Sequence, residues 1–324
     1  MATYKGIQGY TVESLASDPT VEDTVGKLWY NSGSNVWKLS SQGSGAWSSG
    51  GSYGVAMFFG GGIGTQTAAI VAMGGRSPPA PARLVAKEYD GTTWTAIASL
   101  ASYRYGLGGA GSTTAGIVFG GTAGPIPPPG YTEIYNGTAW TEVGDMIVGR
   151  QYVTSAMAGT TTAAMCMGGT TGSDQATCEQ FDGTSWSEVG DLSTAKQYGS
   201  GAGTISGALY SGGNPALTTC ESFNGTSWTE VGDLNTGQGD PSGSGATNTA
   251  ALHFTGVPYS TNCEKWNGTS WTEVGALTKG RQATTGVGSA TAALAVTGST
   301  SPAGGMETEE WNDPNYTITT VTTS

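Results

Sequence analysis

The sequence predicts an all-β fold, a β-propeller in which four-stranded blades repeat around a closed ring. Three observations lead to this prediction. A segment anchored on tryptophan recurs along most of the chain, an Asx-Gly pair precedes five of the six anchors, and the composition is rich in glycine (55 residues) and poor in charge (11%). The 10 tryptophans and 14 tyrosines argue against disorder, because disordered chains contain few aromatic residues.

The recurrence has a regular period. Segments such as QFDGTSWSEVGDL (180–192) occur in five close copies, a divergent sixth copy follows at 310–321, and the anchors lie 42 to 46 residues apart. A period of this length is typical of propellers and solenoids. The anchors are Trp94, Trp140, Trp186, Trp228, Trp271 and Tyr316.

Each repeat carries the signals of four strands, here labelled a to d from the centre of the ring to its rim. The Asx-Gly pair, for instance Asp182-Gly183, predicts a hairpin with a type I′ turn between strands c and d, in which both central residues need positive φ. Strand c ends in an aromatic residue, strand b is an apolar run that closes on glycines, and strand a is made of small residues, as in GSGAGTIS (199–206). Four such strands make one propeller blade.

The repeats resemble the kelch motif. The resemblance lies in the double glycine that closes strand b, the Glu-x-aromatic-Asx-Gly pattern and the tryptophan that follows it, and it covers roughly residues 50 to 324. It implies a propeller with a binding role more often than a catalytic one. The glutamates are Glu133, Glu179, Glu221, Glu264 and Glu309, whereas the first repeat has Lys87 at this place.

The domain organisation predicted for residues 1–324 is one propeller with six complete repeats over 47–324. Residues 26–47 supply strands b, c and d of one further unit, with Trp47 in phase as its anchor. Residues 4–12 either add the missing strand a and close a seven-bladed ring, which the chain length favours, or residues 1–46 form an attachment arm beside six blades. A closed ring leaves no sheet edge exposed.

The N-terminal hairpin LWYNSGSNVWKL (28–39) is similar to short β-units of bacteriophage tail and fibre proteins. Followed by a Gly/Thr/Ala-rich kelch array, it resembles tail-associated virion proteins of marine phages. The resemblance implies a non-catalytic tail- or capsid-associated protein within a larger assembly, contacting other virion proteins or a host-surface protein or glycan. Such a protein is made in the host cytoplasm and is extracellular after lysis. A kelch-type protein-interaction adaptor and a glycan-binding lectin are the alternatives.

Composition excludes several other functions. The net charge of −12 and the lack of a basic run predict no binding to nucleic acid, whose recognition needs basic patches. No apolar stretch of about 18 residues occurs, so we expect no membrane insertion. The N-terminus also lacks the basic and apolar regions of a secretory signal.

We expect no enzyme activity, no cofactor and no metal. His253 is the single histidine and is expected to be a packed or surface strand residue, and a His-based metal site or a Ser-His-Asp triad is hard to assemble from one histidine. Equivalent glutamates of different blades are spread around the ring and cannot converge on calcium. Cys178, Cys220 and Cys263 share one repeat position and are expected to be buried, while Cys166 and Cys178 flank one hairpin, which leaves a disulfide between them open.

The candidate partner-binding face carries the b–c loops, because these loops differ between repeats and variable loops on a rigid scaffold usually carry recognition. The same face should hold basic residues near the start of strand a. The alternative is that each basic residue pairs with a neighbouring acidic residue such as Asp191 or Asp233. The predicted contact residues are Arg104, Arg150, Lys196, Arg281, Pro78, Pro79, Pro127 and Pro128.

Overall fold

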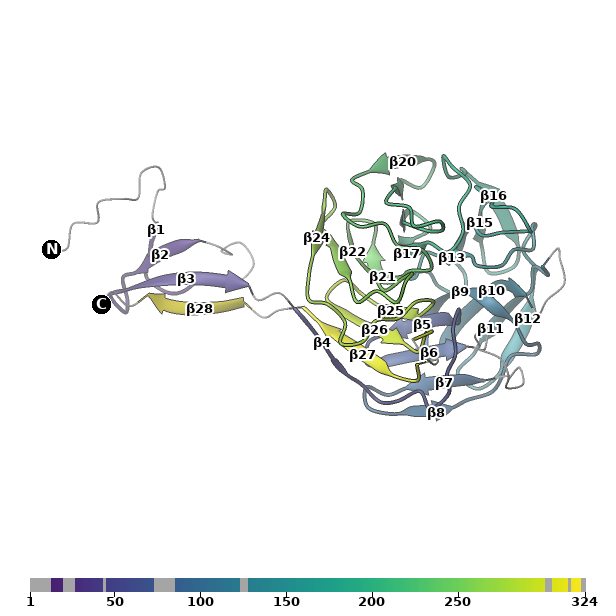
Figure 1. Cartoon of the computed structure of the whole chain (residues 1–324), viewed down its shortest axis with the longest axis horizontal. Coiled ribbons are helices and arrows are strands. Elements are labelled where there is room, and N and C mark those ends of the chain that lie inside the picture. The colour runs from purple at the N-terminus through teal and green to yellow at the C-terminus, as the bar shows by residue number, and fades with distance from the viewer. Residues whose placement is uncertain are drawn as a thin grey trace. The chain divides into compact units, whose positions relative to one another are not determined.

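The computed structural model describes residues 13–19, 27–42, 45–72, 85–122, 128–300, 305–313 and 316–321. These residues form strands, turns and loops, with 28 strands and no helix (Figure 1). In this part of the chain, accordingly, no helix could cross a membrane. The chain divides into two compact units, one formed by Ala46–Asn312 and the other by Met1–Gly45 together with Asp313–Ser324.

The larger unit contains six antiparallel four-stranded sheets, which we number as blades 1 to 6. Blade 1 is β5 (Gly61–Thr65), β6 (Ala68–Ala72), β7 (Ala86–Tyr89) and β8 (Trp94–Ala96), and blade 2 is β9 (Tyr105–Ser112), β10 (Ala115–Thr122), β11 (Thr132–Tyr135) and β12 (Trp140–Val143). Blade 3 is β13 (Thr154–Ser155), β14 (Ala164–Met167), β15 (Cys178–Phe181) and β16 (Trp186–Val189), and blade 4 is β17 (Ser200–Thr204), β18 (Gly207–Ser211), β19 (Cys220–Phe223) and β20 (Trp228–Val231). Blade 5 is β21 (Ser242–Thr247), β22 (Ala250–Phe254), β23 (Cys263–Trp266) and β24 (Trp271–Glu273), and blade 6 is β25 (Thr285–Gly288), β26 (Ala292–Val296), β27 (Thr308–Asn312) and β4 (Ala46–Ser49).

The blades close into a ring around a central axis. Their innermost strands contact one another in a cycle, β5 to β9, β13, β17, β21, β25 and back to β5 (Figure 1). The predicted all-β propeller of four-stranded sheets is therefore confirmed. Seven four-stranded sheets occur in the described residues, the number that the sequence favoured, but six of them form the ring and the seventh belongs to the other unit.

The ring closes between the two ends of the repeat array. Strand β4 is the outermost strand of blade 6, where Trp47 lies opposite Trp311 with ring centroids 5.6 Å apart. The assignment of Trp47 to a further unit, and of Tyr316 to the outer strand of the last repeat, was therefore wrong. Closure brings the N-terminal segment into the last blade, so the ring spans residues 46–312 and not 47–324.

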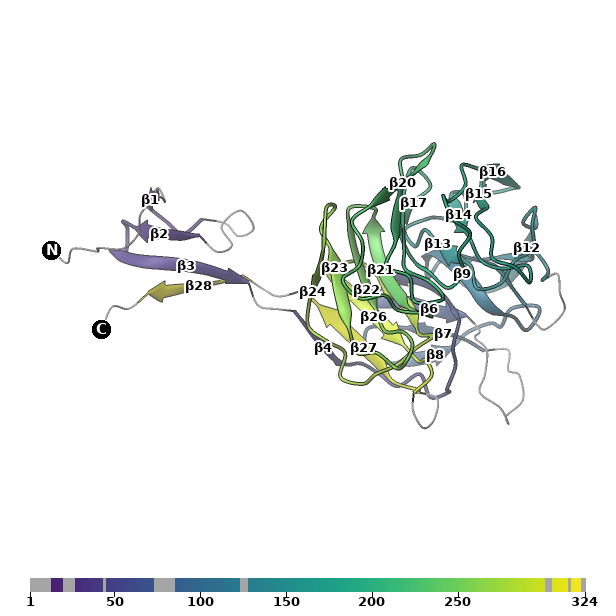
Figure 2. The ribbon, with the colours of Figure 1, turned by 45° about the horizontal axis from the view of Figure 1, so that its top comes forward.

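The smaller unit is a sheet made from both ends of the chain. Its strands are β1 (Glu13–Leu15), β2 (Leu28–Asn31), β3 (Val36–Gln42) and β28 (Tyr316–Val321), with β1 parallel to β2 and β28 antiparallel to β3 (Figure 2). The structure therefore agrees with the second arrangement that the sequence left open, six blades and a separate N-terminal segment. It differs in one respect, because the C-terminal strand β28 belongs to the same sheet as the N-terminal strands. The strand predicted at residues 4–12 lies outside the described residues.

The Asx-Gly segments form hairpin loops, but not the predicted type I′ turns. In blade 3, Phe181 pairs with Trp186, so the loop has four residues, and Gly183 has a φ of +99°. Asp182 does not have a positive φ, whereas a type I′ turn would require one. Its carboxylate Oδ1 accepts the backbone N–H groups of Thr184 and Ser185 at 2.8 and 2.9 Å. This side-chain capping explains why Asp or Asn stands first in each pair.

Two tryptophan contacts hold neighbouring strands and blades together. In every blade the aromatic residue of strand c lies opposite the strand-d tryptophan, with centroids 4.9 to 5.6 Å apart. In five blades the indole Nε1–H also donates to the preceding blade. The pairs are Trp94 to Thr308, Trp140 to Ala98, Trp186 to Thr132, Trp228 to Gly190 and Trp271 to Gly232.

Replacing one buried anchor should therefore destabilise the ring. Trp186→Ala would empty a site between Phe119 and Phe181 and remove the 2.9 Å hydrogen bond to blade 2. We expect the free energy of unfolding in denaturant to fall by about 3–5 kcal/mol. Trp140→Ala, at a half-buried anchor, should cost less. A loss below about 1 kcal/mol for Trp186→Ala would contradict this account.

The innermost strands lie so close together that most of them carry glycine where they meet. Around the axis the equivalent residues are Gly62, Gly109, Ser155, Gly201, Gly243 and Gly286. A Cβ atom on any of these glycines would lie within 3.0 Å of an oxygen atom of the neighbouring inner strand. Ser155 is the exception, and its Oγ accepts the N–H of Gly109 at 3.4 Å. We call these six residues the axial circle.

Candidate binding face

One end of the ring, which we call the loop face, carries the b–c loops and the connections from strand d to the next strand a. The opposite end carries the a–b turns and the Asx-Gly loops. Strand alternation imposes this division, since successive strands of each blade are antiparallel. The predicted contact residues were all assigned to the loop face.

The four basic residues of the prediction are buried. Arg104, Arg150 and Arg281 are 0% exposed and Lys196 is 2% exposed, and each forms an ion pair of 2.6 to 2.8 Å with the repeat glutamate of its own blade. The predicted basic rim was therefore wrong, because these side chains cannot reach a partner. The alternative of acidic pairing was right in kind, but the partners are Glu133, Glu179, Glu221 and Glu309, and not Asp191 or Asp233.

Each of the three arginine pairs joins three segments of chain. In blade 2, Arg104 Nη1 donates to the carbonyls of Gly120 and Tyr131, at the end of strand b and the start of strand c. The other oxygen of Glu133 accepts the N–H of Ala101, in the connection from blade 1, at 2.9 Å. Burial lowers the pKa of the Arg104 guanidinium, and the carboxylate of Glu133 acts in the opposite direction. The glutamate of the repeat motif and the basic residue that pairs with it thus fix the connection from the preceding blade to strand c of their own blade.

Two blades lack the basic residue. In blade 1, Met57 takes its place and Lys87 takes the place of the glutamate, with Nζ 2.6 Å from the carbonyl of Tyr53. In blade 5, Gln238 takes its place and Glu264 accepts the side-chain amide of Asn235 at 2.8 Å. Neither blade therefore contains a buried cation bound to a buried carboxylate.

Of the four prolines predicted to contact a partner, the structure describes Pro128. Pro128 is buried, and its carbonyl lies beside Gly149 of the connection that enters blade 3, so its ring does not form a contact surface. Pro78, Pro79 and Pro127 lie outside the described residues.

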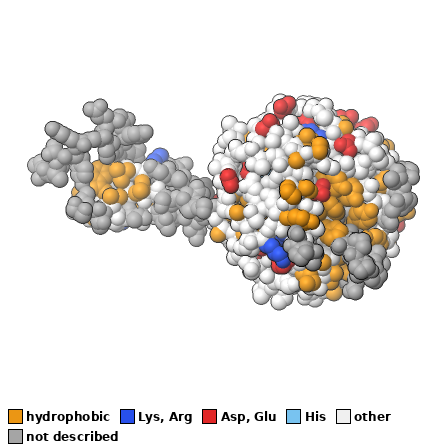
Figure 3. Space-filling view, in the orientation of Figure 1, with side chains coloured by type: hydrophobic (Ala, Val, Ile, Leu, Met, Phe, Trp, Pro, Cys, Tyr) orange, Lys and Arg blue, Asp and Glu red, His pale blue; other side chains and the backbone are white. Residues whose placement is uncertain are grey.

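The loop face is instead apolar. In the part of the ring that the structure describes, all the exposed large hydrophobic side chains lie in b–c loops or in a d–a connection. Figure 3 shows this face, on which hydrophobic side chains extend from near the centre of the ring toward its rim. The exposed residues are Tyr131, Ile147, Val257, Tyr259 and Met306, with Ile147 61% exposed.

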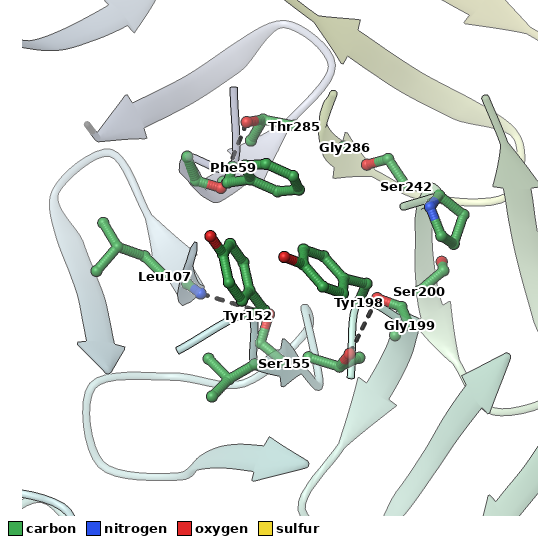
Figure 4. A pocket seen from close by; sticks show the side chains of 18 of the residues that line it. Phe59, Leu107, Tyr152, Ser155, Tyr198, Gly199, Ser200, Ser242, Thr285 and Gly286 are labelled. Atoms are coloured by element: carbon green, nitrogen blue, oxygen red, sulfur yellow. Dashed lines mark hydrogen bonds between the residues drawn. The ribbon is translucent and has the colours of Figure 1, made fainter. Parts of the chain in front are cut away.

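An aromatic cluster, which we call the axial mouth, lies where the loop face meets the axis. Its residues belong to one repeat position, three residues before the axial circle, which has positive φ in all six blades. The residues at this position are Phe59, Gly106, Tyr152, Tyr198, Asp240 and Ala283. The three aromatic rings point toward one another (Figure 4), with centroid distances of 5.1 Å for Phe59–Tyr152, 5.3 Å for Phe59–Tyr198 and 4.1 Å for Tyr152–Tyr198. Backbone hydrogen bonds such as Tyr198 N–H to Tyr152 O join neighbouring blades here.

A cavity of about 80 Å³ adjoins these rings. Inner-strand glycines and hydroxyl side chains line it, among them Ser155, Ser200, Ser242 and Thr285 (Figure 4). The sequence analysis did not identify this cluster. The signal was an aromatic residue two positions after the basic residue in two repeats, at Tyr152 and Tyr198.

The electrostatics of the axial mouth are acidic. Burial raises the pKa of the Asp240 carboxyl above its usual value. Burial also raises the pKa of the Tyr152 hydroxyl to about 12 and raises that of Tyr198 further, with the charge of Asp240 contributing to both shifts. The hydroxyls are therefore protonated at neutral pH and lie within the field of one carboxylate.

The histidine and the four cysteines are buried. His253 lies in β22, as predicted, and of the two predicted environments it has the packed one, with 0% of the residue exposed. Its Nδ1 lies 3.0 Å from Ser211 Oγ, and burial lowers its pKa to about 3. All four cysteines are buried free thiols whose pKa burial raises to about 12. The open disulfide between Cys166 and Cys178 is therefore not formed.

Comparison with solved structures agrees with the propeller fold. The chain is similar to the protein of "Structure of YjhT", a kelch-like β-propeller, with a TM-score of 0.61 at 14% identity over 83% of this chain and 99% of that chain. Identity this low establishes the fold alone. No protein-family profile and no curated protein sequence matches the chain.

Proposed function

We propose that this chain is a non-catalytic recognition protein of a virus particle, associated with its tail or capsid. In this proposal the loop face of the ring contacts a host surface or a neighbouring virion protein, and the smaller unit attaches the ring to the particle. The observation that carries the binding role is the concentration of exposed hydrophobic side chains on the loop face. Exposed apolar side chains that gather on one face mark an interaction surface.

The opposite end of the ring provides the contrast. Its turns present paired hydroxyls, such as Thr160 with Thr162 and Thr247 with Thr249, and capped Asx residues, all of them exposed polar groups bonded within their own turn. The buried histidine and thiols favour a binding role over catalysis, since none is both accessible and suitably ionised. The virion assignment rests on the sequence resemblance of the N-terminal hairpin and repeats.

The test has two readouts. Antibodies against the purified chain should label virus particles from its source in immunogold electron microscopy. Ile147→Glu combined with Tyr259→Ser, two exposed positions of the loop face, should reduce adsorption of the chain to host cells by about tenfold, equivalent to 1.4 kcal/mol. Thr184→Glu, exposed at the opposite end, is the matched control and should leave adsorption unchanged. Unlabelled particles would refute the virion role, and equal adsorption of both variants would refute the assignment of the face.

A further inference from the structure

Blade 5 keeps the glutamate of the repeat but not the cation that pairs with it elsewhere. Glu264 is 1% exposed, and none of the lysines and arginines that the structure describes forms an ion pair with it. Its carboxylate oxygens accept neutral N–H groups, among them the backbone N–H groups of Asn235 and Thr236 at 2.8 and 3.0 Å. The described residues therefore supply no positive charge to balance a carboxylate that is removed from water, which is a costly state.

In the arginine blades, the cation lies among three oxygen-bearing groups. The guanidinium of Arg150 in blade 3 donates to the carbonyls of Gly168 and Thr177, and it also donates to the repeat glutamate. Arg281 has the same three kinds of partner in blade 6. This place inside each blade, between the end of strand b, the start of strand c and the repeat glutamate, we call the cation position.

Blade 5 brings the equivalent oxygen atoms together in the same register. Phe254 lies opposite Cys263, as the corresponding residues of strands b and c do in blade 3. The N–H of Thr255 donates to the carbonyl of Asn262 at 3.2 Å, and blade 3 has the corresponding bond at 3.1 Å. The oxygen atoms around the cation position of blade 5 are therefore the carbonyls of Thr255 and Asn262 and the carboxylate of Glu264.

Gln238 stands where blades 2, 3, 4 and 6 have arginine or lysine, but its side chain is one bond shorter than lysine and two bonds shorter than arginine. Its Oε1 lies beside Gly256, the residue after Thr255, at 2.7 Å from the place that a Cβ of Gly256 would take. Gln238 is 2% exposed, and neither Oε1 nor Nε2 has a hydrogen-bond partner. Buried polar side chains are normally bound, and one that is not calls for an explanation such as an ion. The amide thus lies next to the cation position with an oxygen that can bind an ion.

The chemistry of these groups selects the ion. All of them are oxygen atoms, which suit hard cations. A single carboxylate supplies a single negative charge, whereas calcium sites usually combine several carboxylates. Backbone carbonyls replace the hydration shell of K⁺ in channel filters. A water molecule would satisfy the amide of Gln238 but would leave the charge of Glu264 unbalanced, whereas a monovalent cation meets both needs.

We propose that the cation position of blade 5 binds a monovalent metal cation, Na⁺ or K⁺. Glu264 supplies the negative charge, and the neutral oxygen ligands are Gln238 Oε1 and the carbonyls of Thr255 and Asn262. The ion does in this blade what arginine or lysine does in blades 2, 3, 4 and 6. The inference goes beyond the proposed function and does not depend on it, because the site is buried and takes no part in partner contact.

The experiment compares the thermal unfolding of the full chain in NaCl, KCl and choline chloride at equal concentration. Choline carries the same charge but is too large for the site, so the three salts screen surface charges equally. An ion that binds the folded chain alone stabilises it, and the unfolding midpoint should be about 2–4 °C higher in NaCl or KCl than in choline chloride. The rise should saturate as the salt concentration increases, and the salt with the larger rise identifies the ion.

Variants of Gln238 place the effect in blade 5. Gln238→Lys reproduces the arrangement of blade 4, where Lys196 pairs with Glu221 at 2.7 Å. Its ammonium group should occupy the cation position, so the midpoint in choline chloride should rise and the difference between the salts should vanish. Thr184→Lys adds the same charge at an exposed position and is the matched control, which should keep the difference. Gln238→Met removes one ligand and should lose most of the difference, with an unchanged midpoint in choline chloride.

Two results would overturn the proposal. Equal midpoints of the unaltered chain in the three salts would show that no alkali cation stabilises it. A difference between the salts that persists undiminished in Gln238→Lys would show that the ion binds elsewhere. If Gln238→Lys does not fold, Gln238→Met decides in the same way, since it replaces the amide with an apolar side chain of similar length and adds no charge.

Discussion

Gly286→Ala should lower the free energy of unfolding by about 3 kcal/mol, although it adds only one methyl group. The new Cβ would lie within 3.0 Å of the carbonyl oxygen of Gly243 on the neighbouring inner strand. That oxygen belongs to backbone held on both sides by the axial circle, so a local side-chain rotation cannot relieve the contact. Chemical denaturation of the purified chain, followed by tryptophan fluorescence, measures the loss.

Gly239→Ala is the matched control. Gly239 is also buried, one residue before Asp240, but an added Cβ would have no neighbour closer than 3.6 Å, which is ordinary van der Waals contact. Neither glycine has positive φ, so backbone conformation does not distinguish them. We expect Gly239→Ala to stay within about 1 kcal/mol of the unaltered chain. Equal losses for the two substitutions would show that crowding at the axis is not the cause.

Arg150→Met should cost about 3–5 kcal/mol, because it leaves the carboxylate of Glu179 buried without its cation. The arginine and the glutamate are both 0% exposed and lie 2.8 Å apart. The substitution also removes the donor for the carbonyls of Gly168 and Thr177. The same denaturation measurement applies, and the unfolding midpoint should fall without loss of the β-sheet signal at low denaturant.

Lys279→Met tests whether burial, and not the ion pair itself, sets this cost. Lys279 and Glu307 are 2.6 Å apart but about half exposed, at 47% and 46%, and a pair of this kind contributes at most about 1 kcal/mol. In blade 5, Gln238→Met removes no charge and should likewise cost little, since both polar atoms of the Gln238 side chain are buried without a hydrogen-bond partner. If Arg150→Met proved no more damaging than Lys279→Met, the buried pairs would not be what attaches the blades.

The sequence predicted the repeating unit well because its signals are local. The Asx-Gly pair, the opposed aromatic residues and the double glycine all lie within one blade, so the spacing along the chain reports their pairing directly. Closure could not be predicted in the same way. Trp47 pairs with Trp311, and the periodicity of Trp47 fits equally well with a first unit or with the last blade.

The buried ion pairs were misassigned for a related reason. Arginine is usually exposed, so a basic residue at the start of each strand a suggested a rim, and the glutamate lies 25 to 29 residues further along the chain. The informative signal was their joint absence in the first repeat, which has Met57 and Lys87 instead. The axial mouth was missed because its residues come from different blades and meet only when the ring closes.

The closure of blade 6 has a mechanical consequence. The chain enters the ring through β4 and leaves it through β27, and these strands are paired with Ala46 opposite Asn312, so both connections to the smaller unit depart from the same end of one sheet. A tension applied between the two units would pull β4 and β27 together in one direction, without sliding one past the other. The load would pass to the ladder between β27 and β26, where five residue pairs from Ala292–Asn312 to Val296–Thr308 resist it in shear and must yield together. A ring closed in this way resists being peeled open one hydrogen bond at a time.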